Sequence, residues 1–219
     1  MDFLTSFIDI ALNLDHYLGN IISLFGSWTY VILFLVVFSE TGIIILSFLP
    51  GDTLLFVIGA LSASGKLNLG FCMIILSIAA ILGDTVNYHI GKYIGPKIFF
   101  KEESKLFSKK HLIRAHNFYE KYGGKTIILA RFIPIIRAFA PFVAGIGTMS
   151  YKKFLLYNVV GGILWVVSLS YAGFLFGNIP IVRDNFAIVI IAIVIISNLP
   201  AIISELSRRL RKNKSKEIK

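Results

Sequence analysis

An apolar stretch that contains two arginines and two prolines limits the fold more than any other feature of this sequence. Residues 130–147 read ARFIPIIRAFAPFVAGIG, with Arg131 and Arg137 inside the apolar run and Pro134 and Pro141 interrupting it. Proline removes a backbone donor and clashes with the preceding helical turn. We therefore expect the helix to break at both prolines.

The charges on either side of this stretch predict how it meets a bilayer. An ordinary span has its basic flank on one side, whereas this stretch has Lys125 before it and Lys152 and Lys153 after it. That arrangement favours a re-entrant hairpin over residues 126–149, which enters and leaves by the same face. Non-helical backbone at membrane depth is tolerated where it is buried in protein or lines a cavity, so we expect the arginines to face a cavity.

The composition places the chain among polytopic membrane proteins. Its mean hydropathy is +0.79, with 56% hydrophobic and 16% charged residues, unlike a soluble domain. A single cysteine, Cys72, excludes an internal disulfide and a multi-thiolate metal site. The net charge of +10 does not indicate nucleic acid, because the cations lie beside apolar spans, where they set topology and bind anionic lipid head groups.

The remaining segments predict one membrane domain over residues 1–219. The N-terminus lacks the basic region of a cleavable signal peptide, and the interrupted apolar pattern of its first residues favours an amphipathic helix on a membrane face. A long apolar arm, a Pro50-Gly51 break and an arm too short to span about 30 Å of bilayer suggest a second re-entrant hairpin. The predicted segments are the N-terminal helix at 1–26, this hairpin at 28–65, transmembrane helices at 69–95, 154–177 and 186–206, a basic loop with a surface helix at 96–125, and a basic tail at 207–219.

The basic loop and the basic tail fix the predicted topology. Both are expected to be cytoplasmic, which places the C-terminus in the cytoplasm. Two crossings separate them if the arginine hairpin returns to the cytoplasmic side. The hairpin that contains Glu40 then enters from the outer face.

The two halves of the chain also resemble each other. Glu40 precedes Pro50 by ten positions, and Arg131 precedes Pro141 by ten. Each half is a hairpin plus one crossing, so the copies are inverted, as in many secondary transporters. The predicted fold is therefore all-α and polytopic: an inverted repeat of re-entrant hairpin plus transmembrane helix, with an extra C-terminal span and amphipathic surface helices. Two Gly-x-x-x-Gly pairs, expected at close helix contacts, recur in the two halves: Gly91 and Gly95, and Gly173 and Gly177.

Five strings of residues carry a resemblance to a known family. FSETG, FLPGD, GDTVNYHIGKYIG, ARFIPIIRAFAPFVAGIGTMSY and NVVGGILW resemble, in this order, the DedA family of bacterial inner-membrane proteins. That family shares its VTT domain with eukaryotic lipid scramblases of the endoplasmic reticulum. The resemblance implies a carrier in a bacterial inner membrane that moves undecaprenyl phosphate or phospholipid, coupled to the proton gradient. It also implies functional acids at Glu40 and Asp52 and functional arginines at Arg131 and Arg137.

The residue types agree with these roles and leave a structural alternative open. Arginine at membrane depth is costly and usually marks a pathway, and its planar fork matches phosphate oxygens. We therefore interpret Arg131 and Arg137 as phosphate-binding residues. The alternative is structural pairing of the arginines with Glu40, Asp52 or Asp84.

The acids have the same two interpretations. Burial disfavours the charge of a carboxyl group and a nearby arginine favours it, so Glu40 can exchange a proton or form a permanent ion pair. Asp52 can also cap the short arm of its hairpin, and Asp84 is interpreted as a structural partner of an arginine. Auxiliary structural roles are assigned to Pro50, Gly51, Pro134, Pro141 and Gly145.

The sequence favours transport over chemistry. We expect no enzyme activity, because no serine or cysteine nucleophile has an obvious base, and we expect no cofactor, metal or nucleic-acid partner. The predicted partners are a phosphate-bearing membrane lipid, protons and anionic lipid head groups at the basic loop and tail. The alternatives are an uncoupled phospholipid scramblase and a non-transporting assembly or homeostasis factor.

Overall fold

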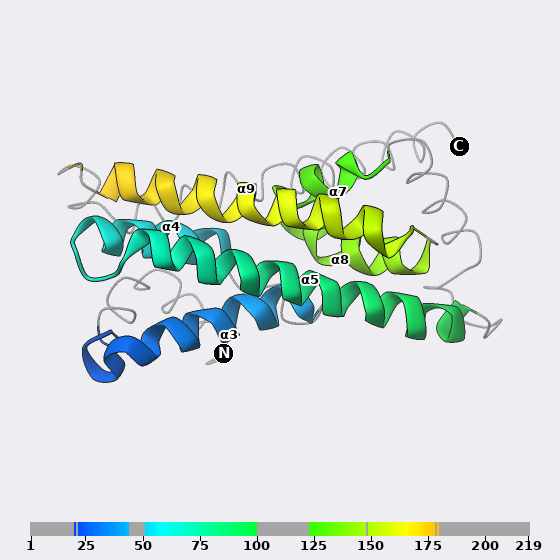
Figure 1. Cartoon of the computed structure of the whole chain (residues 1–219), viewed down its shortest axis with the longest axis horizontal. Coiled ribbons are helices and arrows are strands. Elements are labelled where there is room, and N and C mark those ends of the chain that lie inside the picture. The colour runs from blue at the N-terminus through cyan, green and yellow to red at the C-terminus, as the bar shows by residue number, and fades with distance from the viewer. Residues whose placement is uncertain are drawn as a thin grey trace, which may run out of the picture.

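The computed structural model describes residues 20, 22–43, 51–99, 123–147, 149–177 and 179. The regular structure in these ranges is entirely helical (Figure 1), which confirms the all-α class. The predicted span at 186–206, the basic tail, and most of the N-terminal segment and basic loop lie outside the described residues.

Among the described residues, three helices are long and apolar enough to cross a membrane, by length and composition: Ile22–Gly42, Leu69–Ile94 and Tyr151–Gly177. The second and third agree with two predicted spans, and they belong to helices α5 (Leu69–Phe99) and α9 (Tyr151–Gly177). The first contains a short 3-10 turn, η1 (Gly26–Trp28), and helix α3 (Thr29–Gly42). Residues 22–26 fall within the surface segment predicted at 1–26, and in the structure they continue into this long apolar helix.

Three shorter helices complete the described fold: α4 (Gly51–Ala63), α7 (Lys125–Ala130) and α8 (Pro134–Ile146). The chain breaks between α7 and α8 over residues 131–133. Pro134 is the first residue of α8, where its fixed φ suits a helix start and its missing N–H is not needed. The 126–149 stretch is therefore not one continuous helix.

The break predicted at Pro141 is wrong, because this proline lies inside α8. A proline inside a helix removes one backbone hydrogen bond and pushes on the preceding turn, but packing in a membrane bundle can compensate. Here α8 packs along α5, and the Asn87 amide of α5 donates to Ala138 O in the turn before the proline (3.0 Å).

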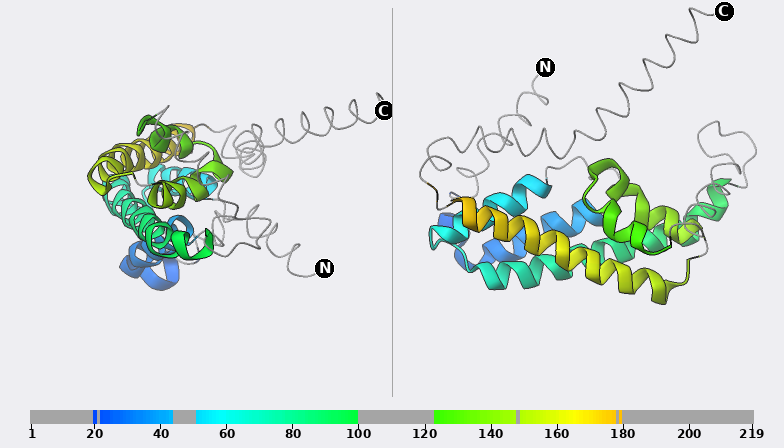
Figure 2. Two further views of the ribbon diagram at one scale, coloured as in Figure 1. Left: turned by 90° about the vertical axis from the view of Figure 1, so that its right-hand side faces the viewer. Right: turned by 90° about the horizontal axis from the view of Figure 1, so that it is seen from above.

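The two short helices α4 and α8 lie in opposite halves of the bundle, with α5 and α9 running along its length (Figure 1). Helix α3 packs on α5, α4 packs on α9, and α8 packs on α5. The view from above shows the same separation of α4 from α7 and α8 (Figure 2). The re-entrant orientation of each hairpin in a membrane, and the inversion of the repeat, stay predictions.

Glycines allow two equivalent helix contacts. A Cβ at Gly173 of α9 would overlap the backbone of Phe56 in α4, and a Cβ at Gly91 of α5 would overlap the backbone of Phe142 in α8. The expected close packing at these two glycines is confirmed. The reciprocal glycines of the short helices follow three residues after each phenylalanine, and they approach the backbones of Ser170 and Tyr88: Gly59 and Gly145.

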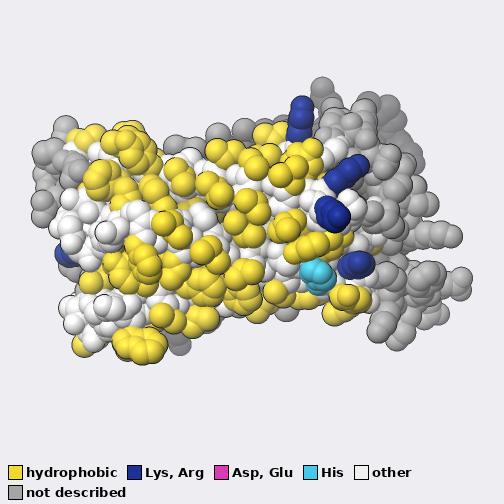
Figure 3. Space-filling model, viewed as in Figure 1, with side chains coloured by type: hydrophobic (Ala, Val, Ile, Leu, Met, Phe, Trp, Pro, Cys, Tyr) yellow, Lys and Arg dark blue, Asp and Glu magenta, His cyan; other side chains and the backbone are white. Residues whose placement is uncertain are grey.

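The outer surface of the described structure is apolar along most of its length, and cations gather near one end (Figure 3). Exposed lysines mark the end at which α5 finishes and α7 and α9 begin: Lys92, Lys125, Lys152 and Lys153. Lys66 is exposed in the turn between the end of α4 and the start of α5. An apolar belt with a basic rim at one end is typical of a membrane protein whose basic end faces the cytoplasm.

Candidate functional site

Arg137 lies at the centre of a buried ion-pair network. Its Nη2 is 2.5 Å from Glu40 Oε1, and its Nη1 is 2.6 Å from Asp52 Oδ1. Arg137 is 5% exposed, Glu40 is 1% exposed and Asp52 is 13% exposed. Both terminal nitrogens of one guanidinium group are thus held by carboxylates from the other half of the chain.

The network forms where helix ends meet. Glu40 lies in the last turn of α3, and Asp52 lies in the first turn of α4. Arg137 lies in the first turn of α8. The N–H of Gly51 donates to Glu40, and a Cβ at position 51 would overlap that carboxylate. Any side chain at this position would therefore force the Glu40 carboxylate to shift.

Trp165 of α9 completes this site, and sequence reasoning missed it. Its indole Nε1 donates to Asp52 Oδ1 over 2.9 Å. The Arg137 guanidinium carbon lies 4.6 Å from the ring centroid, a distance at which a cation is attracted to the ring face. The tryptophan is fully buried. A tryptophan in the middle of a span, away from the interfacial belts where this residue usually lies, was the available signal.

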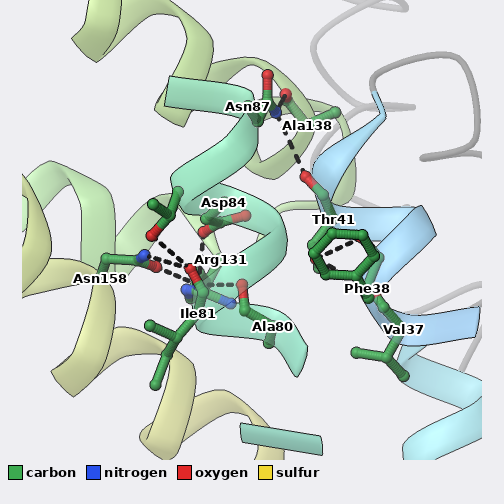
Figure 4. Close-up of polar contacts among 11 residues, drawn as sticks. Val37, Phe38, Thr41, Ala80, Ile81, Asp84, Asn87, Arg131, Ala138 and Asn158 are labelled. Carbon is green, nitrogen blue, oxygen red and sulfur yellow. Dashed lines mark hydrogen bonds and ion pairs between the residues drawn. The ribbon is translucent and has the colours of Figure 1, made fainter. Parts of the chain in front are cut away.

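Arg131 belongs to a separate cluster, shown in Figure 4. Its Nη2 is 2.5 Å from Asp84 Oδ2 and 2.5 Å from Asn158 Oδ1, and it donates more weakly to Ala80 O at 3.4 Å. Arg131 and Asp84 are each 2% exposed. The predicted ion pair between Asp84 and an arginine is present.

The two arginines pair with different acids: Arg131 with Asp84, and Arg137 with Glu40 and Asp52. The break between α7 and α8 places Arg131 before the turn and Arg137 after it, so the two side chains reach different acids. Their guanidinium carbons lie 6.0 Å and 4.6 Å from the ring centroid of Trp165, which connects the two clusters. Pro50 lies outside the described residues.

Two buried asparagines tie the clusters to the backbone, and neither was singled out from the sequence. Asn158 donates from Nδ2 to Ile81 O at 3.0 Å while its Oδ1 accepts from Arg131. Asn87 donates from Nδ2 to Ala138 O at 3.0 Å and to Thr41 O at 3.4 Å (Figure 4). It thereby joins the end of α3 to α8 through α5.

The charge balance of the site is its main electrostatic property. The described residues set three carboxyl groups, those of buried Glu40 and Asp84 and partly buried Asp52, against two guanidinium groups. With all five groups ionised, one negative charge is in excess. A buried net charge is costly, and removing one partner of a buried pair is strongly destabilising. The excess lies in the Arg137 cluster, which has two carboxyl groups for one guanidinium group.

Comparison with known proteins identifies the family. The VTT domain model matches residues 49–175, more than half of the chain. The chain is 50% identical to Protein DedA of Escherichia coli K12 over 205 residues, covering 93% of this chain and 94% of that protein. This chain belongs to the DedA family. No solved structure matches it.

Two further relatives are less similar in sequence. An uncharacterized membrane protein of Mycobacterium tuberculosis H37Rv is 44% identical over 82% of this chain and 80% of that protein. The inner membrane protein YqjA of Escherichia coli K12 is 32% identical over 69% of each chain. The VTT match includes Asp52, Asp84, Arg131 and Arg137, whereas Glu40 lies before it. The site thus joins the VTT domain to the helix that precedes it.

Proposed function

We propose that this protein moves a phosphate-bearing lipid between membrane leaflets, with undecaprenyl phosphate or a phospholipid as substrate, coupled to protons. Its place is a bacterial inner membrane, with the C-terminus in the cytoplasm. The reaction is displacement across the bilayer without covalent change, so the protein is not an enzyme in this proposal.

The geometry of Arg137 carries the proposal. Glu40 Oε1 and Asp52 Oδ1 occupy the two terminal nitrogens of a buried guanidinium group. Two oxygens at the end of an arginine fork have the arrangement in which phosphate oxygens also bind. In this proposal the two acids occupy the place on Arg137 that a lipid phosphate takes when it displaces them. The hydrocarbon tail of the lipid stays in the membrane.

Proton exchange at the two acids supplies the coupling step. A proton on Glu40 or Asp52 removes that carboxylate's charge and weakens its bond to Arg137. The arginine is then able to accept phosphate. When the proton leaves toward the cytoplasm, the ion pair forms again and the phosphate is expelled. The excess of acids over arginines in the site supports an exchangeable proton.

A non-transporting structural role is the second candidate, and one observation favours it. Both terminal nitrogens of Arg137 already have carboxylate partners, and Trp165 contacts both Arg137 and Asp52. A network satisfied in this way can also serve to hold α3, α4, α8 and α9 together. The two candidates differ in whether substitutions change flux or stability.

Reconstitution into liposomes tests the proposal. The purified protein is given labelled undecaprenyl phosphate, a labelled phospholipid, and the corresponding alcohol and diacylglycerol without phosphate. We expect protein-dependent movement of a phosphate lipid and no acceleration of its phosphate-free partner. Equal movement of both members of a pair, or no movement of any lipid, would reject the proposed substrate class. Flux that is independent of a proton gradient would instead indicate an uncoupled scramblase.

A further inference from the structure

We infer that Asn158 is a positioning residue for a phosphate-binding site on Arg131, and that Gly161 keeps this site uncovered. The inference rests on the proposed function, since it concerns the same substrate chemistry. It separates the roles of the two arginines. Both terminal nitrogens of Arg137 bind acids, whereas two donor nitrogens of Arg131 are buried without a hydrogen-bond partner among the described residues.

The Arg131 guanidinium group is held at one corner. Nη2 donates to Asp84 Oδ2, Asn158 Oδ1 and Ala80 O. Nε and Nη1 are buried and have no hydrogen-bond partner among the described residues. Figure 4 shows the contacts of Arg131 with Asp84, Asn158 and Ala80. All the acceptors that the structure describes for the Arg131 guanidinium group are bound by Nη2. The other two donor nitrogens, Nε and Nη1, have no acceptor among the described residues.

Buried donor atoms of a charged group normally have hydrogen-bond partners. A charged donor without a partner costs more free energy than a neutral donor without one. Arg131 is only 2% exposed, so bulk water does not compensate. An acceptor that approaches Nε or Nη1 therefore gains a charge-assisted hydrogen bond without first displacing a carboxylate. A phosphate group supplies several such acceptor oxygens.

Asn158 suits this role because it fixes the guanidinium group without adding charge. Its Oδ1 accepts from Arg131, and its Nδ2 donates to Ile81 O, so both ends of the amide are held. An aspartate in the same place could still accept from Nη2. It would, however, set a second carboxylate beside Arg131 and lower the attraction for an anion.

The glycines of α9 provide the second part of the site. The Arg131 side chain lies against Gly161, where an added Cβ would be 3.2 Å from Cδ and 3.5 Å from Nε. At Gly162 an added Cβ would be 3.4 Å from Nη2 and 3.0 Å from Ile81 Cγ1. A methyl group at position 161 would therefore contact the Nε side of the Arg131 side chain without changing any charge, and it would also lie 3.2 Å from Ile128 Cα.

Binding to the whole purified chain in detergent tests this assignment. The probes are short-chain phosphatidic acid, the diacylglycerol with the same chains, and inorganic phosphate. The test variants are Asn158→Asp and Gly161→Ala. The matched controls are Asn68→Asp, at an exposed position where the side chain accepts from Phe71 N, and Gly70→Ala, where a Cβ meets only Asn68 Oδ1, at 3.5 Å.

We expect Asn158→Asp to bind phosphatidic acid about tenfold more weakly, the scale of one charge-assisted hydrogen bond. Gly161→Ala should also lose affinity, and both controls should bind as the native protein does. Diacylglycerol binding should not change in any variant. Asn158→Asp buries an added carboxylate, so a lower melting temperature is expected for either role. Weaker phosphatidic acid binding with native diacylglycerol binding, measured on folded protein, is the result that a purely structural role does not predict.

The outcomes separate the inference from the function on which it rests. Native affinity for phosphatidic acid in both test variants would overturn the roles of Asn158 and Gly161 and leave lipid transport standing. A native protein that does not prefer phosphatidic acid to diacylglycerol would overturn both proposals. Inorganic phosphate that binds as tightly as phosphatidic acid, and is weakened by the same substitutions, would support the anion site and count against a lipid substrate.

Discussion

Arg137 Nη2 donates to Glu40 Oε1 across 2.5 Å, and this bond joins residues 97 positions apart in the sequence. It connects the end of α3 to the start of α8, at the level where Asp52 begins α4. One buried contact therefore links the broken helices of both halves. A change in this contact is a change in how the halves meet.

Arg137→Lys keeps the positive charge and removes the planar fork. A single ammonium group cannot reproduce the separate bonds of Nη1 and Nη2 to Asp52 and Glu40. We expect a folded, membrane-inserted protein with lipid flux lowered at least about tenfold, the scale of one lost charge-assisted hydrogen bond. The measurement is flux in liposomes, with Lys152→Arg as an exposed control. Native flux in Arg137→Lys would argue against direct phosphate binding by Arg137.

Gly51→Ala tests whether the acid must be held at the start of α4. The added methyl group would overlap the Glu40 carboxylate, so the Glu40–Arg137 bond must lengthen or break. We expect a loss of about 1–3 kcal/mol in the free energy of unfolding, as for other overpacked sites, together with reduced flux. Gly70→Ala is the control, because its new methyl group makes an ordinary contact. An unchanged melting temperature in Gly51→Ala would show that this packing is not required.

Trp165 can be divided into its hydrogen bond and its ring. Trp165→Phe removes the Nε1 donor to Asp52 and keeps an aromatic face beside Arg137, which should cost about 1 kcal/mol of stability. Trp165→Leu also removes the cation–π contact, worth a further amount of about 0.5–2 kcal/mol. Chemical denaturation of both variants measures the difference. Equal stability of the two would mean that the ring face contributes nothing.

Glu40→Gln distinguishes a carrier from a scaffold. Glutamine keeps the shape and an acceptor for Arg137 Nη2 but cannot ionise, and Asp52 still neutralises the arginine. The carrier account predicts a folded protein that has lost driven transport. If the Glu40–Arg137 pair is mainly structural, the cost should approach about 3–5 kcal/mol, the usual loss when a buried pair is broken. Melting temperature and flux are measured on the same purified sample, and a fully active variant would remove Glu40 from the mechanism.

The sequence predicted the helical class, two of the described spans and the presence of buried acid–arginine pairs. These follow from apolar length and from the cost of isolated charges in a membrane, which are local properties. The start of α8 at Pro134 follows from proline geometry in the same way. The continuation of α8 through Pro141 does not, because it depends on packing against α5 and on Asn87, which are distant in sequence.

The pairing within the site was also beyond local reasoning. Either arginine could reach either hairpin acid while the position of the turn between α7 and α8 was unknown. Trp165 and Asn158 have no charge, and the position of Trp165 in the middle of its span was the available sequence signal. Their importance arises from the approach of α9 to both arginines, which is a tertiary property.

The most direct test of the proposed carrier is the accumulation of a labelled phosphate lipid in one leaflet under an imposed pH difference. Liposomes that contain the purified protein are given a proton gradient, and the leaflet distribution is followed until it is constant. The account predicts an unequal distribution that reverses when the gradient is reversed and disappears when protons equilibrate. An equal distribution under both gradients, despite rapid movement of the lipid, would contradict proton-coupled transport.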